Sequence, residues 1–288
     1  MSMQIGVAIA FNHLTTPDYI ADAARFIEQA GFHSLWVPEH VLLFPDYASR
    51  YPYADDGRVP GNPQGVLDPF TALTFIAAQT RRVRLGTGIC LVPQRQPVYT
   101  AKMVADLDYL SGGRVDFGVG IGWLAEEFQA LGMDFHTRAR RCAEYIDAMK
   151  ALWADGVSSF TGETVEIQSC YFNPKPVQKP HPPIYFGGES EPALKRVATQ
   201  GDGWYGYDLE PAGVRERLVL LDRMLADAGR SRADIDVVVC PNRHKITAET
   251  VAAYRDAGVE QLISPVFARS LDDLKRRAER LLTTVAAA

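Results

Sequence analysis

Cysteine is scarce in this chain and long apolar runs are absent, and both facts narrow what the protein can be. The 288 residues contain four scattered cysteines, Cys90, Cys142, Cys170 and Cys240, and no C-x-x-C pair. This spacing is typical of buried thiols in a reducing compartment, not of a disulfide framework. No apolar run reaches the roughly 18 residues of a membrane helix, and the N-terminal stretch MSMQIGVAIAF does not resemble a signal peptide. We therefore expect a cytoplasmic protein with no membrane partner.

Positive charge is also in short supply. The chain has 30 lysines and arginines against 35 aspartates and glutamates, which gives a net charge of −5 and a pI near 5.7. A nucleic-acid surface needs a basic face, so we expect no nucleic-acid partner. The remaining composition, 47% hydrophobic and 23% charged, is that of an ordinary globular protein. The length suits two small domains or one α/β barrel of roughly 250 residues with insertions.

Strand patterns and helix patterns alternate along the whole chain. The expected strands are 4–11, 33–39, 83–92, 114–122, 184–188, 203–207, 234–241 and 261–267. The expected helices are 16–31, 68–80, 97–113, 136–154, 190–201, 211–229, 247–258 and 271–282. Strands that are joined by helices pair in parallel, and strands that are apolar on both faces are covered on both sides. The eight units predict a single (β/α)8 barrel domain over residues 1–288, with a doubly wound two-domain fold as the alternative.

Two stretches interrupt this alternation and are predicted to be insertions. Residues 43–65, after the second strand, are polar, aromatic and rich in proline and glycine, and they are too long for an ordinary connection. Residues 156–168, before the fifth strand, have the pattern of two short strands. Long loops in compact domains are usually functional or mobile, so we expect the substrate to be chosen by residues 43–65 and 156–182.

Glycines gather at the ends of several expected strands. The stretch GVGIGW contains Gly118, Gly120 and Gly122, but a dinucleotide fingerprint needs G-x-G-x-x-G after the first strand, and here Trp123 takes the place of the third glycine. The spacing and the position in the fourth strand both exclude that interpretation. In a barrel, Gly120 and Gly122 would lie at the mouth, where a flat ring could stack on bare backbone. The alternative is that these glycines only relieve crowding.

A second glycine pair precedes an expected helix. Gly187 and Gly188 stand before a helix that Ser190 can cap and that carries Pro192 in its first turn. The free N–H groups of a helix N-terminus form an anion site, and glycines ahead of it let a phosphate approach. The alternative is an ordinary tight turn. Gly86 and Gly88, in the third strand, lie towards the same end of the barrel.

With these motifs in order, the chain resembles the bacterial-luciferase-like family of flavin- and deazaflavin-dependent barrel oxidoreductases. The resemblance is carried by SLWVPEH (34–40), RLGTGICLVPQRQPVYTAK (84–102), DLDYLSGGRVDFGVGIGWLAEEFQALG (106–132), FNPKPVQKPHPPIYFGGES (172–190) and GDGWYGY (201–207). It covers most of the chain and implies a (β/α)8 barrel, which agrees with the count of units. It also implies an oxidoreductase that acts on a small molecule.

The resemblance implies roles for particular residues. A non-prolyl cis peptide at the end of the third strand would fall at Gly88–Ile89, and Gly120, Ile121 and Gly122 would lie near the cofactor ring. The cofactor phosphate would bind at the turn formed by Gly187, Gly188, Glu189 and Ser190. Glu39 and His40 would form the catalytic pair at the end of the second strand.

The histidine of this pair has a chemical reason to be there. An imidazole can take the proton of a substrate hydroxyl while a hydride moves to the ring, although a lone histidine is often only packed or exposed. Glu39 would orient His40, bond the ring system or be solvated. Glu126 and Glu127 are expected to begin a short helix, and either could line the pocket. His13 and His244 are interpreted as structural, and with the histidines dispersed we expect no metal site.

The family uses two cofactors, and the motifs favour the deazaflavin coenzyme F-420 over FMN. The anionic tail of F-420 would find cations among Arg95, Arg138, Lys175, Lys179, Arg243 and Lys245, although exposed lysines and arginines are more often solvated surface. FMN dependence would bring reduced flavin, oxygen and a separate flavin reductase. The chain could also be a non-catalytic flavin-binding barrel, or a metal- or phosphosugar-dependent barrel enzyme. The resemblance also implies a homodimer.

Overall fold

A closed barrel of parallel strands forms the centre of the protein in a computed structural model, which describes residues 3–61 and 63–288. Three residues of the predicted domain lie outside the described residues, namely Met1, Ser2 and Asn62. Asn62 belongs to the predicted 43–65 insertion. The barrel is built from β1 (Gln4–Ala8), β2 (Ser34–Val37), β3 (Arg84–Thr87) continued by β4 (Cys90–Leu91), β5 (Val115–Gly120), β8 (Ile184–Gly187), β9 (Gly203–Tyr207), β10 (Asp236–Cys240) and β11 (Gln261–Pro265). All neighbours pair in parallel, and the ring closes because β1 pairs with β11 and β3 with β5. The predicted (β/α)8 fold is confirmed.

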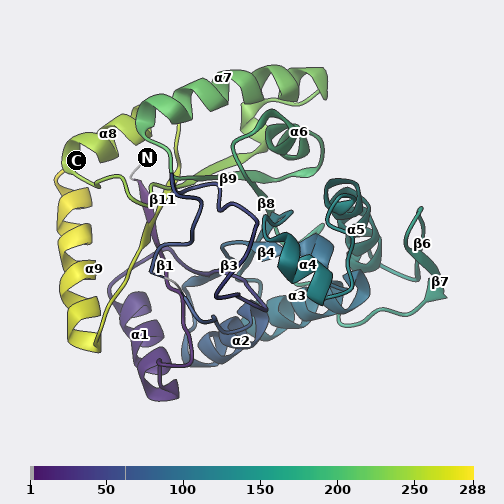
Figure 1. The fold of residues 1–288 in the computed structure, drawn as a ribbon, viewed down its shortest axis with the longest axis horizontal. Helices are drawn as coiled ribbons and strands as arrows, with labels where there is room; N and C mark the ends of the chain where they lie inside the picture. Colours follow the sequence, from purple (N-terminus) through teal and green to yellow (C-terminus); the bar gives the residue numbers. More distant parts are fainter. Residues whose placement is uncertain (1–2, 62) are drawn as a thin grey trace.

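Helices surround this barrel (Figure 1). They are α1 (Pro17–Gln29), α2 (Pro69–Gln79), α3 (Pro97–Ser111), α4 (Ala125–Ala130), α5 (Arg138–Trp153), α6 (Glu191–Gln200), α7 (Pro211–Asp227), α8 (Ala248–Asp256) and α9 (Leu271–Ala286). The cap predicted for the first helix is present, since the Thr16 side chain accepts a hydrogen bond from the Tyr19 N–H and Pro17 begins the helix. The last helix runs four residues beyond the expected end at 282, because Leu281, Leu282 and Val285 still pack against the core.

Both predicted insertions are present. Between α5 and β8 the chain forms an antiparallel hairpin of β6 (Ser158–Thr161) and β7 (Glu166–Cys170), which projects away from the barrel at the right of Figure 1. The stretch after β2 contains no helix or strand among its described residues. The predicted strand 83–92 is found as two pieces, β3 and β4, on either side of Gly88 and Ile89.

Glycines inside the barrel make room for one tryptophan. A Cβ atom added to Gly86 would lie 2.1 Å from the Trp36 ring, and one added to Gly118 would lie 2.0 Å from the Thr87 carbonyl oxygen. The buried Trp36 ring packs against Tyr185 and Tyr205, with centroids 5.8 and 5.2 Å apart. Gly86 and Gly118 therefore relieve crowding inside the barrel, which was one of the two interpretations of the strand glycines.

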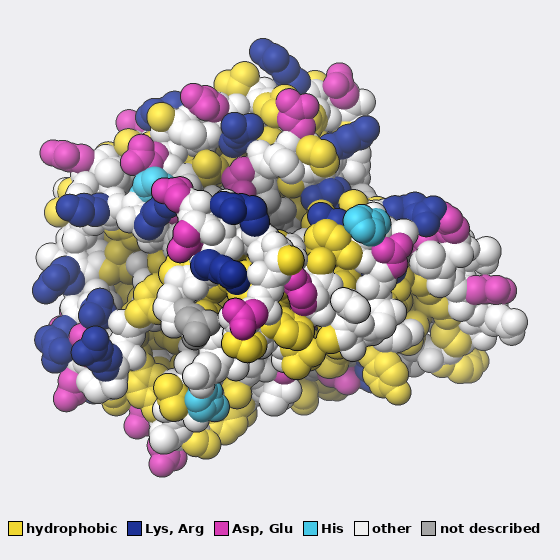
Figure 2. Space-filling view, in the orientation of Figure 1, with side chains coloured by type: hydrophobic (Ala, Val, Ile, Leu, Met, Phe, Trp, Pro, Cys, Tyr) yellow, Lys and Arg dark blue, Asp and Glu magenta, His cyan; other side chains and the backbone are white. Residues whose placement is uncertain are grey.

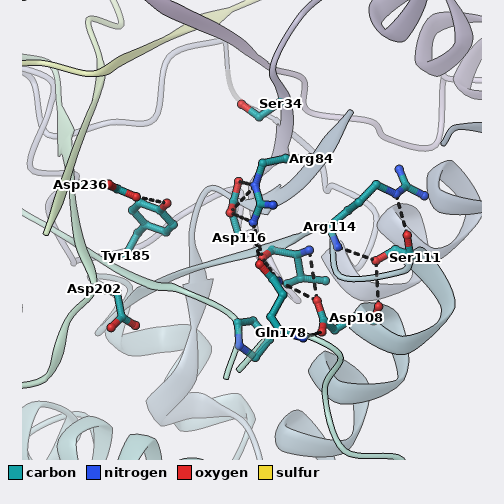
Figure 3. Close-up of polar contacts among 12 residues, drawn as sticks. Ser34, Arg84, Asp108, Ser111, Arg114, Asp116, Gln178, Tyr185, Asp202 and Asp236 are labelled. Carbon is teal, nitrogen blue, oxygen red and sulfur yellow. Dashed lines mark hydrogen bonds and ion pairs between the residues drawn. The ribbon is translucent and has the colours of Figure 1, made fainter. Parts of the chain in front are cut away.

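A network of charged and polar side chains lies at the end of the barrel where the strands begin (Figure 3). Arg84 and Asp116 form an ion pair, and Arg84 also donates to Gln178, 3.1 Å away. Gln178 donates in turn to Asp108 at 2.8 Å. Because these polar groups are satisfied by one another, they close the bottom of the barrel without leaving buried donors unpaired.

The surface charges and the burial of the cysteines can be compared with what the composition predicts. Figure 2 shows lysines, arginines and acidic residues interspersed on one face, with a group of basic side chains over α9. Cys90, Cys142 and Cys240 are buried as expected, and burial raises the pKa of Cys142 to about 12, so this thiol stays protonated. Cys170, on β7, is partly exposed, and this part of the prediction is wrong.

Over the described residues, no helix is long and apolar enough to cross a membrane, and no group of three metal-binding side chains is found.

Candidate active site

The predicted cofactor residues meet at the carboxyl ends of the strands, which we call the barrel mouth. The peptide bond between Gly88 and Ile89 is cis, as the resemblance implied. Cβ atoms added to Gly120 and Gly187 would lie 2.2 and 2.7 Å from the Ile89 Cδ1 atom. The ends of the third, fourth and fifth barrel strands are therefore in contact, and the Ile89 side chain fills the space that these two glycines leave. Ile121 is half-buried and packs against the core. That any of these residues binds a ring stays a prediction.

The predicted phosphate turn begins α6. Gly188 has a φ of +107°, and its carbonyl oxygen accepts a hydrogen bond from Trp204 Nε1 at 3.0 Å. A Cβ atom added to Gly188 would lie 3.0 Å from the Ala193 Cβ atom, so glycine suits this position for its conformation and its size. Ser190 takes the N-cap position, but within the described chain its side chain makes no capping hydrogen bond. The hydroxyl of Ser190 is therefore free for another partner.

Three arginines on α5 and α6 are candidates for holding an anion, and only Arg138 among them was predicted from the sequence. Arg196 follows Ala193 by one turn on α6, and Arg138 and Arg141 belong to α5. Arg138 Nε donates to the Gly122 carbonyl oxygen at 3.3 Å. Burial lowers the pKa of Arg138 and Arg196, and the nearby charge of Arg196 lowers that of Arg138 further.

The arginines are not neutralised within the described part of the chain. The buried Nε of Arg196 and the buried Nη2 of Arg141 have no hydrogen-bond partner there, and none of the three arginines forms an ion pair with a described carboxylate. Buried cationic donors without partners are costly, so the arrangement fits an anionic group such as a phosphate. Arg141 was missed in the sequence, although its spacing of three residues from Arg138 places both arginines on one face of a helix.

His40 lies at the mouth and is held by Glu127. Its Nδ1 atom is 2.9 Å from Glu127 Oε2, and Glu127 Oε1 accepts hydrogen bonds from the N–H groups of Val41 and Leu42 at 2.6 and 2.9 Å. The Glu127 side chain is 1% exposed and the His40 side chain 18% exposed. Glu127 stands in the first turn of α4, where the helix dipole favours a carboxylate. A carboxylate on Nδ1 fixes the proton there and leaves Nε2 as the basic nitrogen.

Glu39 does not orient His40, which corrects the predicted pairing. Its carboxylate accepts hydrogen bonds from Arg95 Nε at 2.5 Å and from the Leu91 N–H at 2.6 Å, and within the described residues it makes no bond to His40. Both residues lie beyond β2, which ends at Val37, and the two side chains bond to different parts of the chain. Glu39 is 3% exposed, so it is not solvated either. It ties the end of β2 to β4 and to Arg95.

Most of the other predicted cations already have partners. Arg95 is shared by Glu39 and Asp68, and Arg243 pairs with Asp208. Lys179 pairs with Asp155, and Lys175 donates to the Leu152 carbonyl oxygen and to Ser158. Lys245 is exposed, as is His13, and His244 lies beside Asp208 and Glu210. The best candidate that remains from the predicted group is Arg138.

A model of the luciferase-like monooxygenase family matches residues 3–284. The chain belongs to this family. A relative from Mycobacterium tuberculosis, described as an uncharacterized protein, is 33% identical over 272 residues, which are 92% of this chain and 93% of the relative. Luciferase-like members are enzymes, namely oxidoreductases and monooxygenases that use flavin or deazaflavin cofactors. A metal- or phosphosugar-dependent barrel enzyme is thereby set aside.

The relatives and the solved structures of similar fold differ in cofactor. An FMNH2-dependent dimethylsulfone monooxygenase from Pseudomonas putida is 34% identical over 191 residues, which are 65% of this chain and 48% of that protein. The structure of an F-420-dependent secondary alcohol dehydrogenase, in complex with an F-420–acetone adduct, superposes with a TM-score of 0.76 over 100% of this chain and 99% of that one. Its sequence identity of 18% makes this a likeness of fold. A flavin or deazaflavin cofactor is supported, and both kinds occur among the neighbours.

Proposed function

We propose that the protein is an oxidoreductase that uses coenzyme F-420 to transfer a hydride to or from a small organic substrate. The observation that carries this proposal is the His40–Glu127 pair at the barrel mouth. Transfer of a hydride to or from an alcohol carbon requires a partner that takes or returns the hydroxyl proton. The likeness of fold to an F-420-dependent alcohol dehydrogenase gives additional support.

The residues present fit the anionic part of either cofactor. Under this proposal the backbone at Gly187, Gly188, Glu189 and Ser190 holds the phosphate, and the unpaired guanidinium nitrogens of Arg141 and Arg196 neutralise it. Gly88, Ile89, Gly120, Ile121 and Gly122 would form the wall beside the ring. When bound, the deazaflavin supplies a ring carbon that accepts or delivers the hydride.

His40 moves the proton in this scheme. With its Nδ1 hydrogen donated to Glu127, its Nε2 takes the hydroxyl proton of the substrate as the hydride leaves, and the imidazolium that forms is stabilised by the buried carboxylate. In the reverse direction the same nitrogen returns the proton to the oxygen. Glu127 is a positioning residue here, and Glu39, proposed from the sequence as catalytic, acts only by holding the strand end that carries His40.

A titration of the purified protein distinguishes the cofactors. F-420 and FMN are added separately, and binding is followed by quenching of cofactor fluorescence. We expect F-420 to bind in the micromolar range and, once bound, to be reduced by small alcohols with a change in its absorbance. Micromolar binding of FMN with no binding of F-420 would refute the proposed cofactor. The same titration with a His40→Ala variant should leave binding intact and abolish turnover.

An FMN-dependent monooxygenase is the second candidate function. Its support is the 34% identity to an FMNH2-dependent monooxygenase. In that case the protein would need reduced flavin, oxygen and a separate flavin reductase as partner. Oxygen consumption with a generic flavin reductase, FMN and NADH, measured with and without candidate acceptors, tests it. Tight binding of either cofactor with no turnover of any acceptor would instead favour a non-catalytic flavin-binding barrel.

The homodimer implied by the resemblance is part of this proposal. One face of α3 exposes Tyr99, Tyr109 and Leu110, which are 73%, 59% and 68% exposed. Exposed apolar side chains that gather on one helix are common at interfaces between subunits. Light scattering should give about twice the chain mass of 31.8 kDa, and a mass of one chain at micromolar concentration would contradict it.

A further inference from the structure

Residues 41–53, here called the mouth segment, begin on the carboxylate that orients His40. The N–H groups of Val41 and Leu42 donate to Glu127 Oε1. A few residues further on, the N–H groups of Ala48 and Ser49 donate to Glu126 Oε1 at 2.6 and 3.1 Å. Two consecutive carboxylates at the start of α4 therefore hold the first two thirds of the segment.

The far end of the mouth segment is bound to a different part of the barrel. The Tyr53 hydroxyl donates to Glu189 Oε2 at 2.8 Å, and the other oxygen of Glu189 accepts the Tyr207 N–H at 2.8 Å. Glu189 belongs to the turn between β8 and α6, to which we assign the cofactor phosphate. The segment thus spans from α4 to this turn, and it is anchored at each end by hydrogen bonds to carboxylates.

Aromatic rings connect the two anchors. Tyr47 and Tyr51 lie edge-on to Trp123, with centroids 5.6 and 5.3 Å apart. Tyr51 contacts Tyr53 at 5.6 Å, and Tyr53 contacts Tyr207 at 4.7 Å. All five rings are half-buried, so each keeps part of its surface open to a ligand. Trp123 also lies 5.8 Å from the His40 ring, so the row of rings reaches the proton carrier.

We propose that the mouth segment is the substrate wall of the active site, and that Glu189 is a positioning residue that couples its closure to occupation of the cofactor turn. The inference rests on the proposed function for the cofactor site. Glu189 offers its backbone to the turn and its side chain to Tyr53, so an anion that fixes the turn also fixes the acceptor of the Tyr53 hydroxyl. The half-buried rings suit an uncharged substrate with an apolar or aromatic surface.

The burial of Glu189 also supports coupling between the mouth segment and the cofactor turn. Burial raises the pKa of Glu189, against the opposing effect of the Tyr207 N–H and the Tyr53 hydroxyl, so the carboxyl group depends on its two donors. A buried acceptor that loses one donor is penalised, so the mouth segment and the turn each stabilise the arrangement of the other. The expected order of binding is cofactor first and substrate second.

Limited proteolysis measures closure without any turnover. Arg50 is exposed between the anchors at Ser49 and Tyr53, and trypsin cleavage after it can be followed by mass spectrometry. We expect saturating F-420 or FMN to slow this cleavage about fivefold or more in the wild type, whereas riboflavin, which lacks the phosphate, should protect less. Trp123 provides a second signal, since Trp36, Trp153 and Trp204 are fully buried and acrylamide should quench mainly Trp123.

The deciding variant is Tyr53→Phe, which removes only the hydroxyl that binds Glu189. Without any cofactor it should be cleaved after Arg50 several times faster than the wild type. With saturating cofactor it should lose most of the protection, while its dissociation constant rises by no more than the factor of protection lost. Tyr171→Phe, just after β7, where the tyrosine is 86% exposed, is the matched control and should behave as the wild type.

Two outcomes would overturn the inference. One is equal cleavage of Tyr53→Phe and wild type in the absence of cofactor, which is measured whether or not the proposed cofactor is correct. The other is a wild type that binds a phosphorylated cofactor, as shown by fluorescence quenching, and is cleaved no more slowly. If FMN slows the cleavage and F-420 does not, F-420 is refuted as the cofactor while the coupling is supported. Failure of the proposed cofactor can therefore be distinguished from failure of the coupling.

Discussion

Glu127→Gln tests the claim that a buried carboxylate decides which nitrogen of His40 is basic. In the wild type one carboxylate oxygen accepts two backbone N–H groups and the other accepts the His40 Nδ1 hydrogen. A glutamine has nearly the same size, and its carbonyl oxygen can keep both backbone bonds. Its amide nitrogen then faces His40 Nδ1 and can only donate, so the imidazole must carry its own proton on Nε2. That nitrogen can no longer accept a proton from the substrate.

The size of the effect follows from two contributions. The charge-assisted hydrogen bond that is lost is worth about 1.5–3 kcal/mol, or roughly 10–150-fold in rate if it is fully expressed in the transition state. Loss of general-base catalysis costs about 10²–10⁴-fold. We therefore expect kcat/KM to fall by about 10²–10⁴ in Glu127→Gln while cofactor binding stays unchanged. Glu127→Ala should also lower the thermal midpoint, because the N–H groups of Val41 and Leu42 lose their acceptor.

The assay is kcat/KM against pH with the cofactor that the titration identifies, together with the thermal midpoint. Glu144→Gln is the matched control, since Glu144 also accepts two backbone N–H groups, those of Thr164 and Val165, but at the β6–β7 hairpin. It should leave kcat/KM within about twofold of the wild type. If Glu127→Gln keeps kcat/KM within about threefold while His40→Ala loses about a hundredfold or more, the orienting role of Glu127 is wrong.

Three further predictions concern the anion site, the barrel interior and an acid-sensitive contact. Arg196→Ala should raise the dissociation constant of FMN or F-420 about tenfold or more, relative to riboflavin, by loss of a charged donor, whereas the exposed Arg140→Ala should not; equal effects on riboflavin and FMN would contradict the phosphate assignment. Gly118→Ala should cost about 1–3 kcal/mol of unfolding free energy or prevent folding, because its Cβ would meet a backbone carbonyl, and Gly120→Ala should cost less because its Cβ meets the end of a flexible side chain. Calorimetry that ranks these two in the opposite order would refute the packing argument. Burial tends to raise the pKa of Glu28, but three backbone N–H donors outweigh it and hold that pKa below its ordinary value of 4.5. Glu28→Gln should therefore lower the urea midpoint at pH 7, and the difference from wild type should shrink as the pH falls below about 4.5 and through the lowered pKa; a difference that does not vary from pH 3 to 7 would count against it.

The order of strands and helices could be predicted from the sequence because it depends on local patterns. Thr16, Pro17 and Gly31 delimit the first helix, and Gly112 ends α3 in a left-handed conformation. Apolar runs that alternate with helices leave few arrangements other than a parallel barrel. The family resemblance then located the cis bond at Gly88–Ile89, which no local pattern would have indicated.

The site was predicted less completely, since it depends on contacts between distant residues. Glu39 and His40 are adjacent in sequence and were interpreted as a pair, but in the structure each side chain bonds to a different partner. The carboxylate on His40 comes from Glu127, 87 positions along the chain, because the barrel brings the ends of β2 and β5 to the same mouth. Arg196 was likewise missed, since only folding sets it beside α5.

The sequence by itself determined the barrel, the end of it at which the candidate site residues gather, and the glycines that let neighbouring strands approach closely there, because all of these follow from short-range patterning and backbone freedom. Only the tertiary structure decided the partners: which carboxylate orients His40, which arginines lack a counter-charge, and where residues 41–53 are anchored. Hydrogen bonds and ion pairs act over about 3 Å, and which groups come that close is fixed by the closure of the barrel and not by their distance along the chain.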